Sequence, residues 1–202
     1  MLGDSISAAY GMSLEEGWVA LLAQRMQQSH ANYRVVNASI SGETSAGGAA
    51  RLSALLQQHK PALVLIELGG NDGLRGYPIK RLRENLGAMV SASQAAGAKV
   101  LLLAMEIPPN YGSRYTQAFR NSFTAVADST GAIYVPFVLD GIATNRDLIQ
   151  ADGIHPTAEA QPLLLENVWP FVQAALAANP DRQATSAGDI DTTAQKSATA
   201  AP

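Results

Sequence analysis

Short apolar runs alternate with longer amphipathic segments along most of the chain, the pattern of strands and helices that follow each other in turn. Five stretches have the character of strands: Met1-Leu2 at the end of a first strand, then 33–39, 62–68, 100–104 and 133–138. The run Ala62 to Leu68 is apolar over strand length, which is typical of a central parallel strand buried on both faces. Pro136 interrupts the last run, so we expect that strand near an edge of the sheet.

Apolar residues at helical spacing predict helices in the segments between these strands. The expected helices cover about 13–29, 44–60, 79–96, 116–130 and 157–178. Ser13 and Glu16 form a capping box that predicts the start of the first helix, and Pro162 and Pro170 should break or kink the last one. The pair Gly47-Gly48 either permits close packing of the second helix or precedes its first turn.

This alternation predicts an α/β fold in three layers, with a central parallel five-stranded sheet and helices on both faces. At 202 residues, one domain is the default. From residue 179 onward the chain is rich in Ala, Thr, Ser and Asp, with Ile190 as its single large aliphatic residue. Because such a segment cannot bury enough apolar surface to order itself, we predict a domain over 1–178 and a disordered tail over 179–202.

Composition excludes several classes of function. The net charge is −3 and the Lys and Arg residues are scattered, so we expect no nucleic-acid partner. The chain has no Cys, which excludes a disulfide framework, a thiolate metal site and a Cys nucleophile. No apolar run reaches the length of a membrane span, so we expect no stable membrane insertion. The oligomeric state stays open.

Candidate chemistry lies where three of the predicted strands end. Ser5, Gly42 and Asn71 each stand in a small, polar turn directly after a strand. The carboxyl ends of parallel strands share one edge of the sheet, which is where open α/β sheets bind ligands. A hydroxyl, a backbone N–H and a side-chain amide can therefore converge there, and these are the parts of a nucleophile with an oxyanion hole.

A general base for this serine is His155. Of the three histidines, it alone lies in a loop rich in polar groups, and Asp152 precedes it by three residues. A turn of that length can bring the Asp152 carboxylate to the imidazole Nδ1–H and leave Nε2 to face a serine. Each residue taken singly also has a structural interpretation: Ser5 as a helix cap, and the others as turn or surface residues. Their joint occurrence at predicted strand ends favours an active site.

Four sequence blocks occur in order: Gly3-Asp4-Ser5-Ile6-Ser7, Ser41-Gly42-Glu43-Thr44, Gly69-Gly70-Asn71-Asp72 and Asp152-Gly153-Ile154-His155-Pro156. On these blocks the chain, from residue 1 to about 178, resembles the SGNH (GDSL) hydrolases. Within that family it looks most like the bacterial group of thioesterase I, lysophospholipase L1 and arylesterase. The resemblance implies a flavodoxin-like fold with neither metal nor cofactor.

Carried over to these positions, the resemblance implies that Ser5 is the nucleophile, His155 the base and Asp152 the residue that orients it. The N–H groups of Ser5 and Gly42 and the side chain of Asn71 would form the oxyanion hole. One departure is that only two apolar residues precede the first block, whereas the family's first strand normally has several. Because members of this group are commonly periplasmic or secreted, we suspect that location and a precursor with residues before Met1, including a removed signal.

We therefore predict a serine esterase for short- to medium-chain acyl esters, with thioesters and lysophospholipids as further candidate substrates. Loops that flank the predicted site contribute Leu74, Arg75, Ile107 and Pro108, which would either line an acyl groove or merely complete the rim. A carbohydrate O-deacetylase of the same fold is the first alternative. The second is a flavodoxin-like binding module without catalysis.

Overall fold

A parallel sheet forms the centre of the structure, a computed structural model that describes residues 1–177. Its four strands lie side by side in chain order: β1 (Leu2–Gly3), β2 (Leu63–Glu67), β3 (Lys99–Leu103) and β4 (Ile133–Val135). β4 ends before Pro136 and lies at an edge of the sheet, as predicted. The tail predicted to be disordered, 179–202, lies outside the described residues.

The prediction of five strands was wrong, because the segment 33–39 forms no regular strand. This segment nevertheless runs beside β1. The Met1 amino group donates to the Val36 carbonyl at 2.8 Å, and Ala38 and Ile40 donate to Met1 and Gly3 at 2.9 and 3.0 Å. These hydrogen bonds are isolated contacts rather than a continuous ladder. The segment occupies the place of an edge strand beyond β1, which is its place in the flavodoxin-like strand order.

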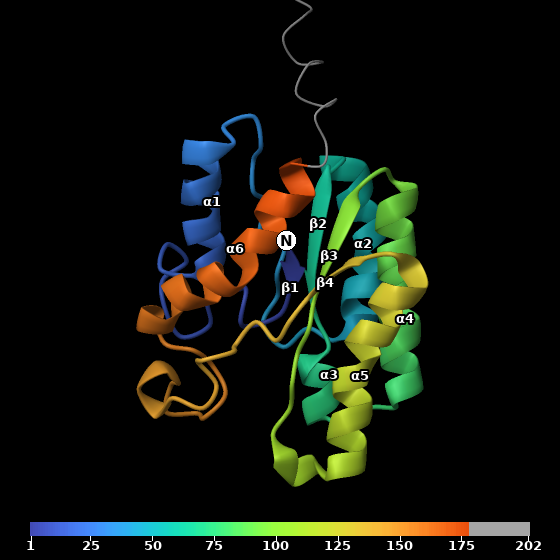
Figure 1. Cartoon of the computed structure of the whole chain (residues 1–202), viewed down its shortest axis with the longest axis vertical. Coiled ribbons are helices and arrows are strands. Elements are labelled where there is room, and N and C mark those ends of the chain that lie inside the picture. Colours follow the sequence, from blue (N-terminus) through green and yellow to red (C-terminus); the bar gives the residue numbers. More distant parts are fainter. Residues whose placement is uncertain (178–202) are drawn as a thin grey trace, which may run out of the picture.

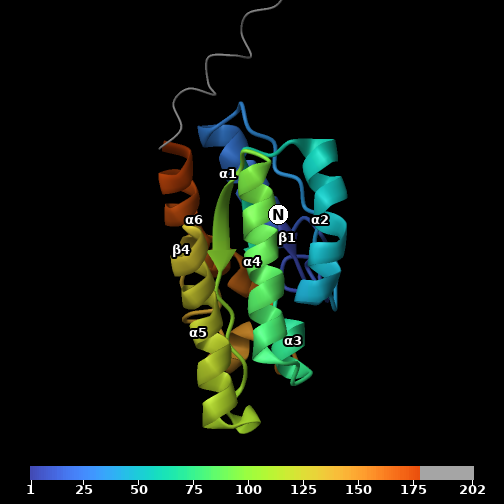
Figure 2. The same cartoon turned by 90° about the vertical axis from the view of Figure 1, so that its right-hand side faces the viewer.

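Helices cover both faces of the sheet, which confirms the α/β/α architecture (Figures 1 and 2). On one face α1 packs against α6, and on the other α4 packs between α2 and α5. The α-helices are α1 (Trp18–Ser29), α2 (Ser45–His59), α3 (Gly70–Leu74), α4 (Ile79–Ala95), α5 (Ser113–Thr130) and α6 (Gln161–Ala177). Short 3-10 helices are η1 (Pro109–Tyr111), η2 (Arg146–Leu148) and η3 (Ala158–Ala160).

Three helices begin three or more residues away from their predicted starts: α1 at Trp18, α5 at Ser113 and α6 at Gln161. The capping-box contact forms, with Ser13 N and Oγ at 2.9 and 2.7 Å from Glu16 Oε2, but it closes a turn. α1 begins only at Trp18, because the extended backbone of Gly17 separates that turn from the helix. Pro162 lies in the first turn of α6, where no backbone N–H is required, and Pro170 lies inside a helix that continues to Ala177.

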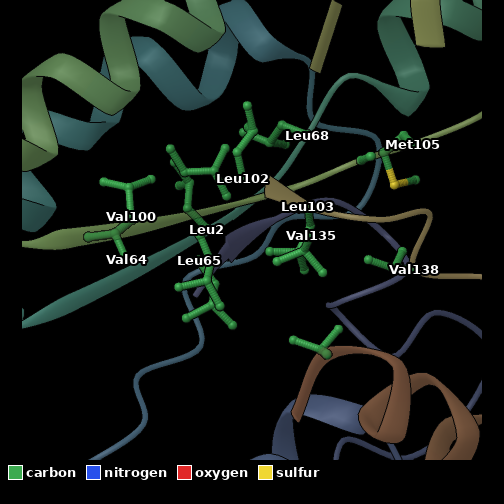
Figure 3. Close-up of a cluster of buried hydrophobic side chains, with 14 of the residues drawn as sticks. Leu2, Val64, Leu65, Leu68, Val100, Leu102, Leu103, Met105, Val135 and Val138 are labelled. Carbon is green, nitrogen blue, oxygen red and sulfur yellow. The ribbon is translucent and has the colours of Figure 1, made fainter. Parts of the chain in front are cut away.

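The core lies between the sheet and the two helical layers. Figure 3 shows side chains from all four strands gathered in it, among them Leu2, Leu65, Leu102 and Val135. Gly48 lies within α2, and a Cβ there would lie only 2.3 Å from the Leu68 side chain. This glycine therefore allows α2 to approach the sheet closely.

A cavity of about 410 Å³ lies beside the amino-terminal part of β2. Its walls come from β1, β2, the segment before residue 39, and the inner faces of α1, α2 and α6. None of the candidate catalytic residues lines this cavity. The candidate site must therefore be built from the loops at the opposite ends of the strands. Within residues 1–177, no helix combines the length and the apolar character that crossing a membrane requires.

Candidate active site

The turn that carries Ser5 begins directly after β1. Asp4 closes it, since its Oδ1 accepts the Ile6 N–H at 3.1 Å and its carbonyl accepts the Ala8 N–H at 2.9 Å. A glycine is required just before this turn, because a Cβ at Gly3 would lie 2.7 Å from Glu67 Oε2. The chain continues in successive turns to residue 12, and Ser5 is 9% exposed at the edge of the sheet. Ser5 is thus held at a sharp turn by residues buried beneath it.

His155 reaches Ser5 from the loop before α6. Its Nε2 lies 2.8 Å from Ser5 Oγ, and its Nδ1 lies 2.6 Å from Asp152 Oδ2. The other oxygen of Asp152, Oδ1, accepts the backbone N–H groups of Ile154 and His155 at 2.9 and 3.1 Å. Gly153, which lies between Asp152 and Ile154, has a φ of +73°, a conformation that favours glycine. This turn explains why a spacing of three residues brings the carboxylate to the imidazole.

The charge of Asp152 determines which nitrogen of His155 carries the proton. Partial burial acts to raise the pKa of Asp152, but the hydrogen bonds from the His155 ring, from its backbone and from Ile154 outweigh it and lower the pKa to about 2. At neutral pH the carboxylate can only accept, so Nδ1 of His155 carries the hydrogen. Nε2 of a neutral His155 is then free to accept the hydrogen of the Ser5 hydroxyl.

Tyr10 and Gln150 also hold His155, and the sequence patterns did not single them out. The Tyr10 ring lies over the imidazole with 4.3 Å between ring centroids, and it is half exposed. Gln150 Nε2 donates to the carbonyls of Tyr10 and Pro156 at 2.8 and 2.9 Å. These contacts tie the Ser5 loop to the His155 loop. No sequence motif links Tyr10 or Gln150 to His155, so these contacts could not be predicted from the sequence.

Asn71 lies beside the Ser5 turn. It belongs to the short helix α3 after β2, and its Nδ2 donates to Asp4 Oδ2 at 3.1 Å. The next residue, Asp72, accepts the backbone N–H and the hydroxyl of Ser45 at 2.8 and 2.6 Å. This contact fastens α3 to the start of α2, shortly after Gly42 in the chain.

Gly42 lies in an exposed turn with a φ of +79°. Its carbonyl accepts a hydrogen bond from Arg75 Nη2 at 3.2 Å, which links this turn to the end of α3. The structure therefore brings Ser5, His155 and Asp152 into one hydrogen-bonded chain. It places Asn71 next to that chain through Asp4, and it joins the Gly42 turn to the same loops through Arg75.

The four candidate substrate-binding residues lie in two loops that contact each other. The Tyr111 hydroxyl donates to the Leu74 carbonyl at 2.9 Å, and Ile107 packs against Gly73 of α3 and the hydrophobic core. Pro108 is exposed. Arg75 is exposed as well, and its side chain binds the Gly42 carbonyl and so holds the Gly42 turn against α3. Among residues 1–177, no cluster of three or more His, Cys, Asp or Glu side chains is placed to hold a metal ion.

The chain is similar to known proteins over most of its length. Residues 1–162 match the GDSL-like Lipase/Acylhydrolase family. Esterase TesA of Pseudomonas aeruginosa is 57% identical over 86% of this chain and 86% of its own length. Thioesterase 1/protease 1/lysophospholipase L1 of Escherichia coli K12 is 43% identical over 82% of this chain and 78% of its own length.

A solved structure is similar as well. The psychrotrophic esterase EstA from Pseudoalteromonas sp., in a form inhibited by monoethylphosphonate, superposes with a TM-score of 0.83 at 48% identity, covering 87% of this chain and 96% of that one. These matches confirm the resemblance drawn from the four sequence blocks and exceed what a shared fold alone would require. The chain therefore belongs to the GDSL-like lipase/acylhydrolase family and is a carboxylic ester hydrolase.

Proposed function

We propose that this chain is a serine esterase that hydrolyses short- to medium-chain acyl esters through a Ser5–His155–Asp152 triad. The observation that carries the proposal is the hydrogen-bonded chain from Ser5 Oγ through both nitrogens of His155 to Asp152 Oδ2. Serine is a weak nucleophile until a positioned base accepts its proton. The Asp152 carboxylate orients that base and stabilises the imidazolium that forms.

In the first half of the proposed reaction, Ser5 Oγ attacks the ester carbonyl while its proton passes to His155 Nε2. The C–O bond to the leaving alcohol then breaks, and His155 gives its proton to that oxygen. This leaves an acyl group on Ser5. In the second half, water gives a proton to His155 and attacks the acyl carbon, and the proton then returns to Ser5 as the carboxylic acid leaves.

The oxyanion hole is proposed to consist of the Ser5 and Gly42 backbone N–H groups and the Asn71 amide. Asn71 is supported most directly, because one of its N–H bonds is held by Asp4 and the amide has a second to offer. Gly42 is supported by its place in the turn that Arg75 joins to α3. Donors fixed in advance in this way stabilise charge as it develops on the carbonyl oxygen.

Replacing Asn71 by alanine is expected to lower kcat by about 10²- to 10³-fold, the usual effect of removing one oxyanion donor. KM should change little, because the donor acts on charge that develops in the transition state. Steady-state kinetics on p-nitrophenyl butyrate would measure this. The matched control is Asn121→Ala, since Asn121 is exposed on α5. An Asn71→Ala enzyme that folds and turns over at a normal rate would exclude the assigned role.

The acyl-chain preference is proposed from the two loops beside Asn71. The two loops that carry Leu74, Arg75, Ile107 and Pro108 contact each other next to Asn71, so an acyl chain bound there would meet apolar side chains. We expect kcat/KM on p-nitrophenyl acetate, butyrate, octanoate and palmitate to peak at butyrate or octanoate and to fall for palmitate. A steady rise through palmitate would contradict the expected short- to medium-chain preference.

Thioesters and lysophospholipids are further candidate substrates, supported by the activities for which the Escherichia coli relative is named. Matched butyryl oxygen ester and thioester substrates would compare the two leaving groups.

The carbohydrate deacetylase is less well supported, because Trp18 and Trp169 are buried and offer no open platform for a sugar ring. Because the chain belongs to a hydrolase family, we no longer propose a binding module without catalysis. A periplasmic or secreted location and the lack of a nucleic-acid partner stay predictions.

A further inference from the structure

A second carboxyl group lies directly beneath the Ser5 turn, and the proposed reaction does not use it. Glu67 is the last residue of β2 and is 0% exposed. The sheet register pairs it with Gly3, so its side chain lies under the turn that follows β1. Its Oε2 accepts the Asp4 backbone N–H at 3.3 Å and the Ser7 hydroxyl at 2.7 Å. Glu67 thus holds the residues on both sides of Ser5.

The direction of these hydrogen bonds is set by Trp18. Its indole Nε1 can only donate, and it lies 3.2 Å from Ser7 Oγ. Ser7 therefore accepts from Trp18 and uses its own hydrogen to donate to Glu67 Oε2. The other oxygen, Glu67 Oε1, has no hydrogen-bond partner among the described residues. An ionised carboxylate here would leave a charged oxygen without a hydrogen bond, which costs more free energy than leaving the O–H of a neutral acid unpaired.

Asp4 is the partner that makes a neutral Glu67 useful. Asp4 is also buried, but three groups stabilise its negative charge: the Ile6 N–H, the Asn71 amide and the nearby His155. After burial, the negative charge of Asp4 is the next cause that raises the pKa of Glu67. The proton of this pair therefore belongs to Glu67, and the charge belongs to Asp4.

The pKa values of the two groups agree with this assignment. Burial is the largest effect on both, and it raises the pKa of Asp4 to about 6. Burial and then the charge of Asp4 raise the pKa of Glu67 well above its usual range. His155 is the other charged or titratable group that faces Asp4, and its cationic form would hold Asp4 ionised. At neutral pH the pair is thus a carboxylate above a carboxylic acid.

We propose that Glu67 is a buried, neutral carboxylic acid that positions the Ser5 turn and, through the Asp4 carboxylate, the Asn71 amide. Glu67 touches neither substrate nor the reacting atoms, so it is a positioning residue. Asp4 Oδ2 is the acceptor that fixes Asn71, and Glu67 Oε2 holds Asp4 in place by accepting its backbone N–H. This role rests on the proposed function, because its consequence for rate acts through the Ser5 nucleophile and the Asn71 oxyanion donor.

Two substitutions distinguish three possible roles of Glu67: a neutral acid, a charged carboxylate and a side chain that only fills space. Glu67→Gln keeps a carbonyl acceptor for the Ser7 hydroxyl and the Asp4 N–H and, like a neutral acid, carries no charge. Glu67→Met keeps the length but removes that acceptor. We expect kcat of Glu67→Gln within about threefold of wild type, since its hydrogen-bonding groups match those of a neutral acid. We expect kcat of Glu67→Met to fall about 10- to 100-fold at nearly constant KM, because the reacting groups are displaced.

Infrared spectroscopy tests the protonation state directly. The carbonyl stretching band of a protonated carboxylic acid, measured at neutral pH in the difference spectrum of wild type and Glu67→Gln, is expected to belong to wild type only. Glu15→Gln, at an exposed position, serves as the control without such a band. Circular dichroism would verify that each variant folds. If Glu67→Met does not fold, the Gln variant and the infrared band still decide the proposal.

The proposal is overturned if the band is absent, if Glu67→Gln loses as much activity as Glu67→Met, or if folded Glu67→Met retains the wild-type kcat. Ser5→Ala, assayed alongside, separates failure of this role from failure of the proposed function. If Ser5→Ala is active, the proposed triad is wrong, but the infrared result on Glu67 still holds. If Ser5→Ala is inactive and wild type shows no protonated-acid band, the triad is supported and only the proposed role of Glu67 is wrong.

Discussion

Replacing Ser5 by alanine is expected to lower kcat for p-nitrophenyl butyrate by about 10⁴- to 10⁶-fold, the scale on which serine hydrolases lose rate with their nucleophile. The physical reason is that Oγ is the atom that His155 Nε2 faces at 2.8 Å, and alanine leaves nothing to attack the carbonyl. The fold should survive, because Ser5 Oγ contacts His155 rather than the hydrophobic core. Initial rates at saturating substrate, with circular dichroism of both proteins, would measure the effect.

A matched control for this variant is Ser13→Ala, since Ser13 is exposed and contacts only its own turn. Reaction with a phosphonate ester adds a second readout, because the solved EstA relative exists in a form inhibited by monoethylphosphonate. Intact mass spectrometry should show one adduct on the wild-type chain and none on Ser5→Ala. An adduct on the alanine variant, or undiminished turnover by it, would mean that another residue is the nucleophile.

Replacing Asp152 by asparagine is expected to lower kcat by about 10³- to 10⁴-fold, because the amide reverses the hydrogen bond to the imidazole. The amide introduced by Asp152→Asn would donate to Nδ1, so the hydrogen of neutral His155 would move to Nε2, which could then no longer accept from Ser5. The loss should approach the lower end of the range, since the Asp152 side chain is 36% exposed and water can compete for Nδ1. Kinetics at neutral pH would measure the change.

The pH profile distinguishes this explanation from a structural one. In wild type the pKa of Asp152 is about 2, so the carboxylate is ionised throughout the neutral and mildly acidic range, and loss of its charge should limit activity only near that pH. Asp128→Asn on the exposed side of α5 is the control for removing a surface charge. If Asp152→Asn retained wild-type kcat, the orienting role would pass to another group.

Much of the fold could be predicted because its signals are local. The run Ala62 to Leu68 and the helical spacing of apolar residues depend only on neighbours in the chain, and β2, α4 and α5 lie close to where those patterns place them. The error over the fifth strand arose because its outcome depended on a partner distant in sequence. The segment 33–39 has the composition of a strand, but its backbone hydrogen bonds with residues 1–3 form no continuous ladder.

The candidate site divides in the same way. Ser5, Asn71 and the Asp152–His155 spacing could be found from the sequence, because strand ends of a parallel sheet share one edge and an Asp-Gly-Ile-His turn closes on itself. Tyr10 could not be found, because its contact with His155 joins two loops that lie far apart in the chain.

Periodicity and short motifs were enough to predict the layered α/β fold, the family and the residues that meet at the edge of the sheet. The environment of Glu67 could not be predicted in this way, because in the sequence it is one polar residue at the end of an apolar run. The register that pairs it with Gly3 buries it under Asp4, and burial beside a second carboxyl group is what changes its protonation. Such an effect depends on distances between strands, which no local pattern contains.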